Sequence, residues 1–597
     1  MSLLVANIHW PGPDGDPTPA LRARLGLPSG ASLQFSLVKR SVDGRRRPPV
    51  WLANYRVELE PAALEAQVLR APPHGVRAYS SRDHERFDKE DALTPGQRST
   101  AHADDLQTAA PLADAVAGPG APALAGDVHP APDLTAGREA PTRPRAWPAG
   151  VRPIVVGAGP AGLFAALRFG EAGIPAVLLE RGGPVEERHH AVRAFWRHAE
   201  LDLDTNVVFG EGGAGAFSDG KIYTRRRDGE LGWIFRRLVD FGADPEILEE
   251  GWAHLGTDRI RAILPRMRAR LIELGVEVRF HAAVHSLLVE DGRCAGVQLA
   301  SGEQLRGGPV LMATGHSARG VWSAMLDAGA AAEQRPIHIG ARIEHPQQLI
   351  DHARYGAARG ALPPASYRLT SHPPARRGRP AARAAHTFCM CPGGTVVGAT
   401  NEPGRVVVNG MSYSKRQAWW ANSAVIVEVR PEDYPGTDPL AGARYQDAIE
   451  QRAFVAGGGG FRAPAQRVAD LLAGRASVDL PRTSYTLGVT PSDLREVLPA
   501  PLIEGLIAAV RHFDKQIPGF AGDDGVLIAP ETRTTAPLRF LRDAQLESPT
   551  LPGLMPVGEG AGYAGGIVSA ALDGDRAARS AIARSGAIAS RATVAPG

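Results

Sequence analysis

The chain has 597 residues, of which 44% are hydrophobic and 22% are charged, and its formal net charge is +3. This length predicts about three or four globular domains, and so small a charge favours neither nucleic acid nor a membrane as a partner. We find no apolar run of about 18 residues, no signal peptide and too few cysteines for a disulfide framework, so we expect a cytoplasmic protein without a membrane segment.

Residues 1–95 predict a small α+β domain. Apolar runs and turn signals indicate three strands and two short helices there, at 3–8, 20–27, 33–39, 50–59 and 62–69. The turn after the second strand carries a basic cluster made of Lys39, Arg40, Arg45, Arg46 and Arg47. A solvated hairpin turn explains this cluster better than a nucleic-acid site, because neither aromatic residues nor a recognition helix accompany the charges. Residues 96–148 are rich in Ala, Pro, Gly and Asp and predict a disordered linker.

A dinucleotide-binding fingerprint follows the linker. The apolar run 154–156 predicts a buried strand, GAGPAG predicts a tight turn into a helix, and the strand 176–179 ends at Glu180. Gly157 makes the turn, Gly159 leaves room for a pyrophosphate, and Gly162 allows close packing of helix on strand. An acid about 20 residues further on suits ribose hydroxyls. The cofactor contacts expected here are Gly157, Ala158, Gly159, Pro160, Ala161, Gly162, Glu180 and Arg181.

A second glycine-rich segment spans residues 206–225. Its glycines would let backbone amides approach an anionic or planar ligand, although a flexible surface loop is the alternative. The contacts expected in it are Gly212, Gly213 and Ala214. Asp219 and Lys221 add polar groups that suit proton transfer or substrate orientation, as does Tyr223, and each is also compatible with a structural role.

The rest of the chain is expected to complete the nucleotide-binding domain and to carry a domain inserted into it. A helix is expected at 258–274, followed by strands at 276–280, 286–290, 295–299 and 307–313. Residues 321–480 predict an inserted substrate or cap domain of mostly strands, for example at 337–344, 385–390, 395–400 and 425–429. A helix is expected at 492–514, and residues 553–578 predict a strand, a glycine-rich turn and a helix.

These pieces resemble the FAD-dependent oxidoreductases with a glutathione-reductase-like nucleotide fold. A closer resemblance is to bacterial uncharacterised FAD-dependent dehydrogenases, on FGEGGAGAFSDGKIYTR, ATGHSARG, RIEHPQ, FCMCPGG, ETRT and GEGAGYAGGIVSAALDG. The resemblance implies FAD, with the ADP half at the fingerprint and the flavin half at the C-terminal turn. It also implies further cofactor contacts at Val284, Ala313, Thr314, Gly315, Gly558, Glu559, Gly565, Gly566 and Ile567.

The expected fold class is α/β. It combines an FAD-binding Rossmann-like, three-layer domain (149–320 and 481–590) with an inserted β-rich domain (321–480) and the small N-terminal domain. The sequence carries no second dinucleotide fingerprint, so NAD(P)H is kept only as a transient electron donor. The expected function is FAD-dependent oxidation or reduction of a small molecule by hydride transfer. The alternatives are a monooxygenase, which GEG in place of GD at residues 558–560 disfavours, and a flavoprotein that binds RNA or protein through its N-terminal domain.

The sequence leaves the roles of a few residues undecided. His316, after the ATG at 313–315, is a third catalytic candidate beside Asp219 and Lys221. Cys389 and Cys391 are compatible with a redox pair, but buried inert thiols are the commoner outcome, and no metal site is expected. The ETRT at 531–534 suits either the flavin edge or a structural ion pair.

Overall fold

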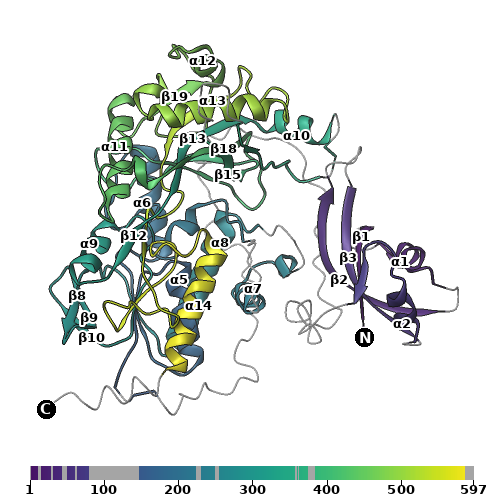
Figure 1. Cartoon of the computed structure of the whole chain (residues 1–597), viewed down its shortest axis with the longest axis horizontal. Coiled ribbons are helices and arrows are strands. Elements are labelled where there is room, and N and C mark those ends of the chain that lie inside the picture. Colours follow the sequence, from purple (N-terminus) through teal and green to yellow (C-terminus); the bar gives the residue numbers. More distant parts are fainter. Residues whose placement is uncertain are drawn as a thin grey trace. The chain divides into compact units, whose positions relative to one another are not determined.

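The computed structural model describes residues 2–10, 15–27, 31–43, 50–60, 63–78, 147–148, 150–222, 230–248, 254–356, 359–360, 362–373 and 383–584 (Figure 1). Tyr223, Arg45, Arg46 and Arg47 and nearly all of the expected linker lie outside these residues. The chain divides into two compact units. The first comprises Met1–Glu139, Arg227–Asp240 and Asp244–Ala253, and the second comprises the remainder. No described helix is long and apolar enough to cross a membrane.

The first unit contains the expected α+β fold. Its antiparallel sheet has the order β2-β3-β1-β4, and a core around Leu3, Val5, Tyr55 and Val57 joins the sheet to helix α1. The elements are β1 (Leu3–His9), α1 (Thr18–Leu25), β2 (Ser32–Asp43), β3 (Val50–Glu60), α2 (Ala63–Arg70) and β4 (Val76–Ala78), with α7 (Leu231–Asp240) and the 3-10 helix η2 (Pro245–Leu248).

The second unit is built on a parallel sheet of order β23-β11-β5-β6-β7. Because β23 comes from the end of the chain and pairs with β11, the C-terminal segment returns to the sheet that the fingerprint begins. The strands are β5 (Ile154–Val156), β6 (Val177–Leu179), β7 (Glu277–Arg279), β11 (Val310–Met312) and β23 (Leu554–Pro556).

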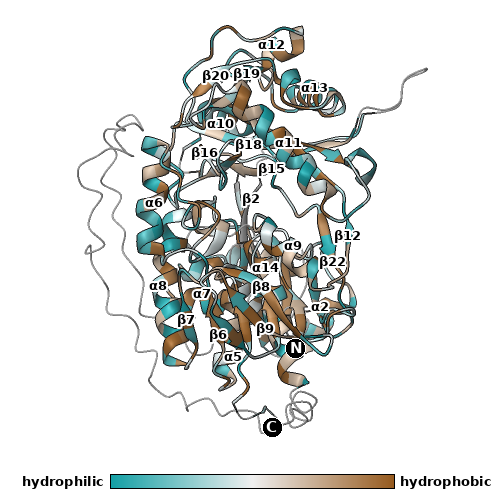
Figure 2. Ribbon diagram, turned by 90° about the vertical axis from the view of Figure 1, so that its left-hand side faces the viewer, coloured by the Kyte–Doolittle hydropathy of each residue, from teal (hydrophilic) through white to brown (hydrophobic). Residues whose placement is uncertain are grey.

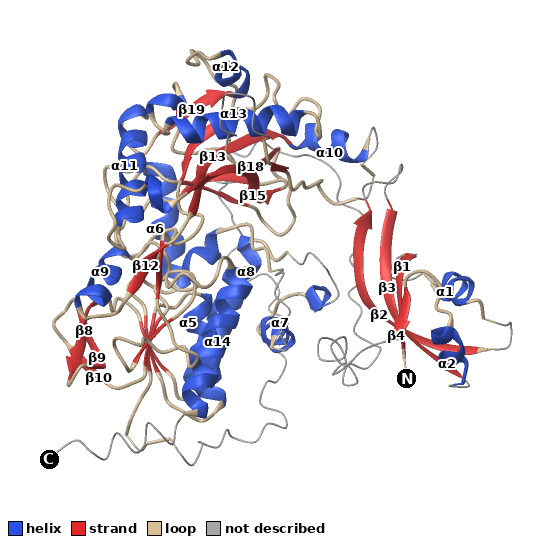
Figure 3. Ribbon diagram, in the orientation of Figure 1, coloured by secondary structure: helices blue, strands red, loops and turns tan. Residues whose placement is uncertain are grey.

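Three layers form around this parallel sheet. Helices α5 (Pro160–Glu171) and α14 (Ile567–Ala583) cover one face, and the antiparallel β8 (Val284–Glu290), β9 (Arg293–Leu299) and β10 (Gln304–Arg306) cover the other (Figure 3). Both helices pack very closely against their neighbours. A Cβ on Gly162 of α5 would lie 1.8 Å from Gly157 O in the preceding turn, and one on Gly574 of α14 would lie 1.9 Å from Ala161 O of α5. The expected α/β class with a Rossmann-like, three-layer domain is confirmed.

Further helices surround this domain. The helix expected at 258–274 is α8 (Thr257–Glu273). Helices α6 (Val185–His198) and α9 (Arg319–Asp327) were not predicted. The surface of α6 is largely hydrophilic (Figure 2), and its charged residues leave only a narrow apolar stripe as a signal. A short 3-10 helix, η1 (Gly213–Phe217), lies in the second glycine-rich segment.

A seven-stranded sheet forms the other half of the second unit, in the order β14-β15-β18-β13-β21-β19-β20. Its strands are β13 (Ile337–Pro346), β14 (Thr370–Ser371), β15 (Ala385–Cys391), β18 (Trp420–Val429), β19 (Ala463–Arg467), β20 (Val489–Pro491) and β21 (Val526–Glu531). The other elements are α10 (Gln347–Tyr355), α11 (Ala441–Ala456), α12 (Val468–Ala473), α13 (Ala500–Asp514), η3 (Pro431–Asp433), η4 (Leu494–Glu496), the pair β16 (Thr395–Gly398) and β17 (Val408–Met411), and the pair β12 (Ala332–Gln334) and β22 (Leu538–Phe540).

Two features of this half differ from expectation. The sheet takes in β20 and β21 and packs against α13, so it extends beyond residue 480, because the antiparallel partner of β13 comes from residues 526–531. The helix expected at 492–514 is also wrong in its first part. The chain forms the single turn η4 and restarts as α13 after Pro499, since a proline cannot donate the backbone hydrogen bond that a continuous helix needs.

Candidate functional site

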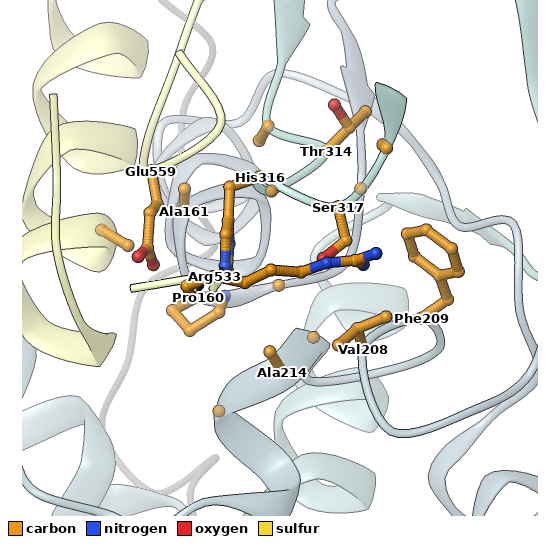
Figure 4. A pocket seen from close by; sticks show the side chains of 18 of the residues that line it. Pro160, Ala161, Val208, Phe209, Ala214, Thr314, His316, Ser317, Arg533 and Glu559 are labelled. Carbon is orange, nitrogen blue, oxygen red and sulfur yellow. Dashed lines mark hydrogen bonds between the residues drawn. The ribbon is translucent and has the colours of Figure 1, made fainter. Parts of the chain in front are cut away.

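A cavity of about 1390 Å³ opens in the second unit, lined by turns of both sheets. It exceeds the range of about 300–1,000 Å³ that is common for ligand pockets, so it can hold a large cofactor together with a substrate. Figure 4 shows how its walls converge. Pro160 and Ala161 begin α5, Ala214 comes from the second glycine-rich segment, His316 follows β11, and Glu559 precedes α14.

The turn from β5 into α5 presents bare backbone to the cavity. Gly159 is the N-cap of α5, and a Cβ placed on it would meet only Gly213 Cα, at 3.8 Å. The first amides of a helix have no intrahelical acceptor, and the helix dipole adds positive potential there. The turn therefore suits the approach of a pyrophosphate.

Glu180, at the end of β6, holds this turn together. Its Oε2 accepts a hydrogen bond from Ala158 N at 2.7 Å, and its Oε1 accepts from Gly182 N at 3.1 Å and from Gly210 N at 2.9 Å. The side chain is buried and also lines the cavity. Two carboxylate oxygens offer about four lone-pair sites, so these three bonds leave capacity for a ribose hydroxyl.

The turn before α14 forms a second part of the cavity wall, beside the start of α5, because a Cβ on Gly558 would lie 3.0 Å from Ala161 Cβ. Cβ atoms placed on Gly565 or Gly315 would meet nothing within 4 Å, so backbone of the loops after β23 and β11 faces open space here as well. Glu559 lies beside His316 (Figure 4), and burial raises the pKa of its carboxyl although His316 partly offsets this. Two open glycine turns on one cavity, before α5 and before α14, fit the two halves of FAD.

Most residues expected to contact the cofactor line this cavity. They are Gly157, Gly159, Pro160, Ala161, Glu180, Arg181, Gly213, Ala214, Val284, Ala313, Thr314, Gly315, Glu559, Gly565, Gly566 and Ile567. Four others support the turns from behind. Ala158 N bonds Glu180, Gly162 lets α5 reach β5, Gly212 donates to Ala158 O at 2.8 Å, and Gly558 donates to Asp573 at 2.8 Å.

Asp219 and Lys221 form a buried ion pair on the cavity wall. Lys221 Nζ lies 2.6 Å from Asp219 Oδ2 and also donates to Met390 O. Ser412 donates to the other Asp219 oxygen, and His254 Nε2 lies 3.5 Å from Asp219 Oδ2. Burial raises the pKa of Asp219, but Lys221 and His254 outweigh it and hold that pKa well below its usual range. Burial lowers the pKa of Lys221, but Asp219 and the two nearby cysteines outweigh burial and raise this pKa above its ordinary value.

A second buried pair lies at the floor of the cavity and was not foreseen from the sequence. Arg342 is fully buried on β13, and its Nε and Nη2 donate to the two oxygens of Glu531, with Nη2 to Oε1 at 3.0 Å. Arg342 Nη2 also donates to Asn409 Oδ1 at 3.0 Å, and its Nη1 donates to Asn422 Oδ1 at 2.9 Å. One guanidinium thus ties four strands together beneath residues that line the cavity. Arg342 begins the RIEHPQ motif and Glu531 begins ETRT, but nothing in the sequence indicated that the two side chains pair.

The ETRT segment supplies a structural ion pair. Arg533 Nη2 lies 2.8 Å from Glu450 Oε2, and its Nε donates to Glu450 Oε1 at 3.0 Å. Arg533 also lines the cavity and extends toward Ser317 (Figure 4). His316 Nε2 lies 2.7 Å from Arg533 O. The ion pair therefore orients one of the expected catalytic side chains.

The wall contributed by the seven-stranded sheet was largely missed. Its polar and aromatic residues come from β14 and β15, with Asn409 added from β17 of the separate β16–β17 pair: Arg368, Thr370, His386, Thr387, Phe388 and Asn409. Apart from Phe388, which begins the FCMCPGG motif, these residues belong to no motif, and only the folded chain brings the three strands together. Within the described residues, no group of three or more His, Cys, Asp or Glu side chains could hold a metal ion.

The chain is similar to several known proteins. Residues 336–534 match the family described as "FAD-dependent protein, C-terminal domain-like". An uncharacterised protein of Clostridium beijerinckii is 42% identical over 431 residues, which cover 72% of this chain and 80% of that protein. Solved structures with some likeness include Escherichia coli quinol fumarate reductase FrdA (14% identity, TM-score 0.35, 75% of this chain and 71% of that one). Another is the 3-ketosteroid-delta4-(5alpha)-dehydrogenase of Rhodococcus jostii RHA1 (13% identity, TM-score 0.31, 73% and 96%).

The expected cofactor, FAD, is confirmed by the family match. The chain belongs to the same protein family as the uncharacterised C. beijerinckii protein, and its residues 336–534 match the domain of FAD-dependent proteins.

Proposed function

We propose that the protein is an FAD-dependent oxidoreductase, a dehydrogenase or reductase, that acts on a small molecule. The observation that carries the proposal is that one cavity joins the open glycine turns of the parallel sheet to a polar wall on the seven-stranded sheet. The first part would hold the cofactor, and the second would hold the substrate. The three-layer arrangement supports the finer assignment to a glutathione-reductase-like nucleotide fold.

The ADP half of FAD would lie against Gly159, Glu180 and Val284, and the flavin half against Ala313–Gly315 and the N-terminus of α14. When bound, FAD supplies hydride transfer through its flavin ring. The chain itself supplies binding, orientation, exclusion of water and the handling of protons.

Lys221 would act as a fixed positive charge. Its bond to Asp219 and its raised pKa keep the ammonium protonated at neutral pH, so it is a hydrogen-bond donor rather than an acid. An ammonium has three donors, and Asp219 and Met390 O take two of them. The third can reach a negatively charged atom of a substrate or of the flavin ring.

His316 is suited to proton uptake. A backbone carbonyl only accepts hydrogen bonds, so the contact with Arg533 O assigns the proton to Nε2 and leaves Nδ1 as the acceptor of a neutral ring. Hydride transfer to or from a carbon atom commonly needs such a partner for the accompanying proton.

The test is the anaerobic reduction of the bound flavin. We expect NADH or NADPH to bleach its visible absorption as a transient donor, and Lys221→Met to slow this reaction by about a hundredfold, as the loss of one fixed donor does elsewhere. Lys415→Met, at an exposed position outside the cavity, is the matched control. If neither nucleotide bleaches the flavin, NAD(P)H is not the donor, and equal rates in both variants would contradict the role of Lys221.

A further inference from the structure

A bulge in β15 sets two of the three cysteines apart from the regular ladder. Phe388 pairs with Ala424 and Cys391 pairs with Asn422, so three steps on β15 match two steps on β18. The extra residue is accommodated by a left-handed backbone at Cys389, with φ 43°. Non-glycine residues rarely adopt this conformation, and those that do cluster at functional sites.

The bulge brings the two cysteines into different surroundings. Cys389 lines the cavity, as do Lys221 and the N-terminal residues of α14, whereas Cys391 is fully buried. The Cys391 thiol donates to Cys389 O, with Sγ 3.2 Å from that oxygen, so its sulfur lies over the peptide of Cys389. Cys389 therefore lines the cavity, and the Cys391 sulfur is packed against the Cys389 carbonyl.

Two cations, the fully buried Arg342 and the half-buried Lys221, fix this turn. Lys221 Nζ donates to Met390 O, the carbonyl between the cysteines, and Arg342 Nη1 donates to Cys389 O at 2.9 Å. Arg342 Nη1 also lies 3.8 Å from Cys391 Sγ. Positive charges beside sulfur favour the thiolate, which is the form that reacts. The arrangement is more elaborate than the packing of two inert thiols requires.

We propose that Cys389 and Cys391 are a redox-active pair that exchanges two electrons with the bound flavin. Oxidation forms one S–S bond, breaks two S–H bonds and releases two protons, and the two electrons pass to the flavin of FAD. Reduction runs the same step in reverse. The inference rests on FAD as the cofactor and is independent of the substrate.

The surroundings of the two thiols also affect how strongly they reduce. Burial raises the pKa of Cys389 to about 11 and that of Cys391 to about 12, although Lys221 and Arg342 lower both in part. A dithiol whose thiolates are poorly stabilised is the stronger reductant. This pair is therefore a stronger reductant than a dithiol with well-stabilised thiolates, and the rate of its oxidation should rise with pH.

The experiment counts electrons and thiols in the FAD-loaded full-length protein. The protein is reduced fully with dithionite without oxygen and then titrated with ferricyanide, and we expect four electrons to be taken up per flavin. After the titration the protein is unfolded in iodoacetamide, and mass spectrometry should find one alkylated cysteine, Cys294, against three in the reduced sample.

Three variants make the test specific. Cys389→Ser and Cys391→Ser should each lower the count to two electrons per flavin, while Cys294→Ser, buried on β9 outside the cavity, should leave it at four. Two electrons per flavin in the wild type, with three alkylated cysteines after oxidation, would overturn the inference. That result would leave the proposed function intact, whereas absence of flavin from the wild type would instead contradict FAD binding.

Discussion

At the scale of single residues, the site depends on buried charges that are neutralised by specific partners. Asp219 is 3% exposed and is surrounded by Lys221, Ser412 and His254. Removing one partner of such a pair leaves an uncompensated charge, which costs far more than the loss of an exposed pair. The same reasoning applies to Arg342 with Glu531 and to Arg533 with Glu450.

We expect Asp219→Asn to lower the free energy of unfolding by about 3–5 kcal/mol, because Lys221 would keep its charge without a counter-ion. Urea denaturation followed by circular dichroism measures this. The control is Glu428→Gln, which breaks the exposed pair with Arg430 and should cost about 0–1 kcal/mol. Equal effects of the two substitutions would contradict the prediction.

The same carboxylate predicts a pH dependence. The folded-state pKa of Asp219 is lowered, so its stabilising contribution is present above the unfolded value of about 3.9 and is lost as the pH falls through the folded-state value. Wild-type stability measured from pH 6 downward should therefore fall more steeply than that of Asp219→Asn. Parallel curves would show that the group is not paired in the folded protein.

Glu180 gives a prediction about cofactor affinity. In Glu180→Gln, one carboxylate oxygen is replaced by an NH2 group, which donates hydrogen bonds and cannot accept them. Only one side-chain oxygen then remains for the three backbone N–H groups. Each hydrogen bond lost contributes about 0.5–1.5 kcal/mol, so we expect FAD to bind at least about tenfold more weakly. Fluorescence titration of apoprotein with FAD measures the Kd, and an unchanged Kd would contradict the assigned role of this carboxylate.

At the scale of elements, the fingerprint was predictable because it is local. Strand β5, the glycine turn, α5, β6 and Glu180 lie within about thirty residues, and each glycine has a steric reason for its place. The seven-stranded sheet was not predictable to the same degree. Strand β13 pairs with β18 and with β21, about eighty and about two hundred residues away, and no local pattern specifies such pairings. Helix α11 was missed because mixed polar and small residues weaken its periodicity.

The close packing of α5 can be tested at Gly162. A Cβ there would lie 1.8 Å from Gly157 O, so Gly162→Ala should push the helix away from the sheet and reduce the flavin retained on purification. Gly308→Ala is the control, because a Cβ at that position meets nothing within 4 Å. Absorbance of flavin relative to protein measures the outcome, and full flavin content in Gly162→Ala would contradict the packing described.

At the scale of the whole molecule, every residue that lines the cavity belongs to the second unit. We therefore expect a protein that lacks residues 1–139 to retain one FAD per chain. Flavin content after gel filtration measures this. A truncated protein that stays folded by circular dichroism but has lost its flavin would show that the first unit is needed for the site.

One part of the cavity wall could be predicted from the sequence and the other could not. The cofactor half is built from contiguous motifs, and the structure gathers most of the expected residues around one cavity. The proposed substrate half joins Thr370, His386 and Asn409 from three strands of two sheets, and only the folded chain brings them together. Asp219 was a candidate from its motif, but its partner Ser412 lies almost two hundred residues away.

The central claim is that the glycine-lined cavity is the FAD site, and Gly159→Val tests it most directly. A Cβ at Gly159 meets only Gly213 Cα at 3.8 Å, so the protein leaves room for a Cβ on the turn assigned to the pyrophosphate, which the valine side chain should block. The measurement is the cofactor released from denatured protein, identified by mass spectrometry and counted per chain. We expect one FAD per chain in the wild type and almost none in a Gly159→Val protein of unchanged thermal stability. A wild type without FAD, or a variant with its full complement, would contradict the account.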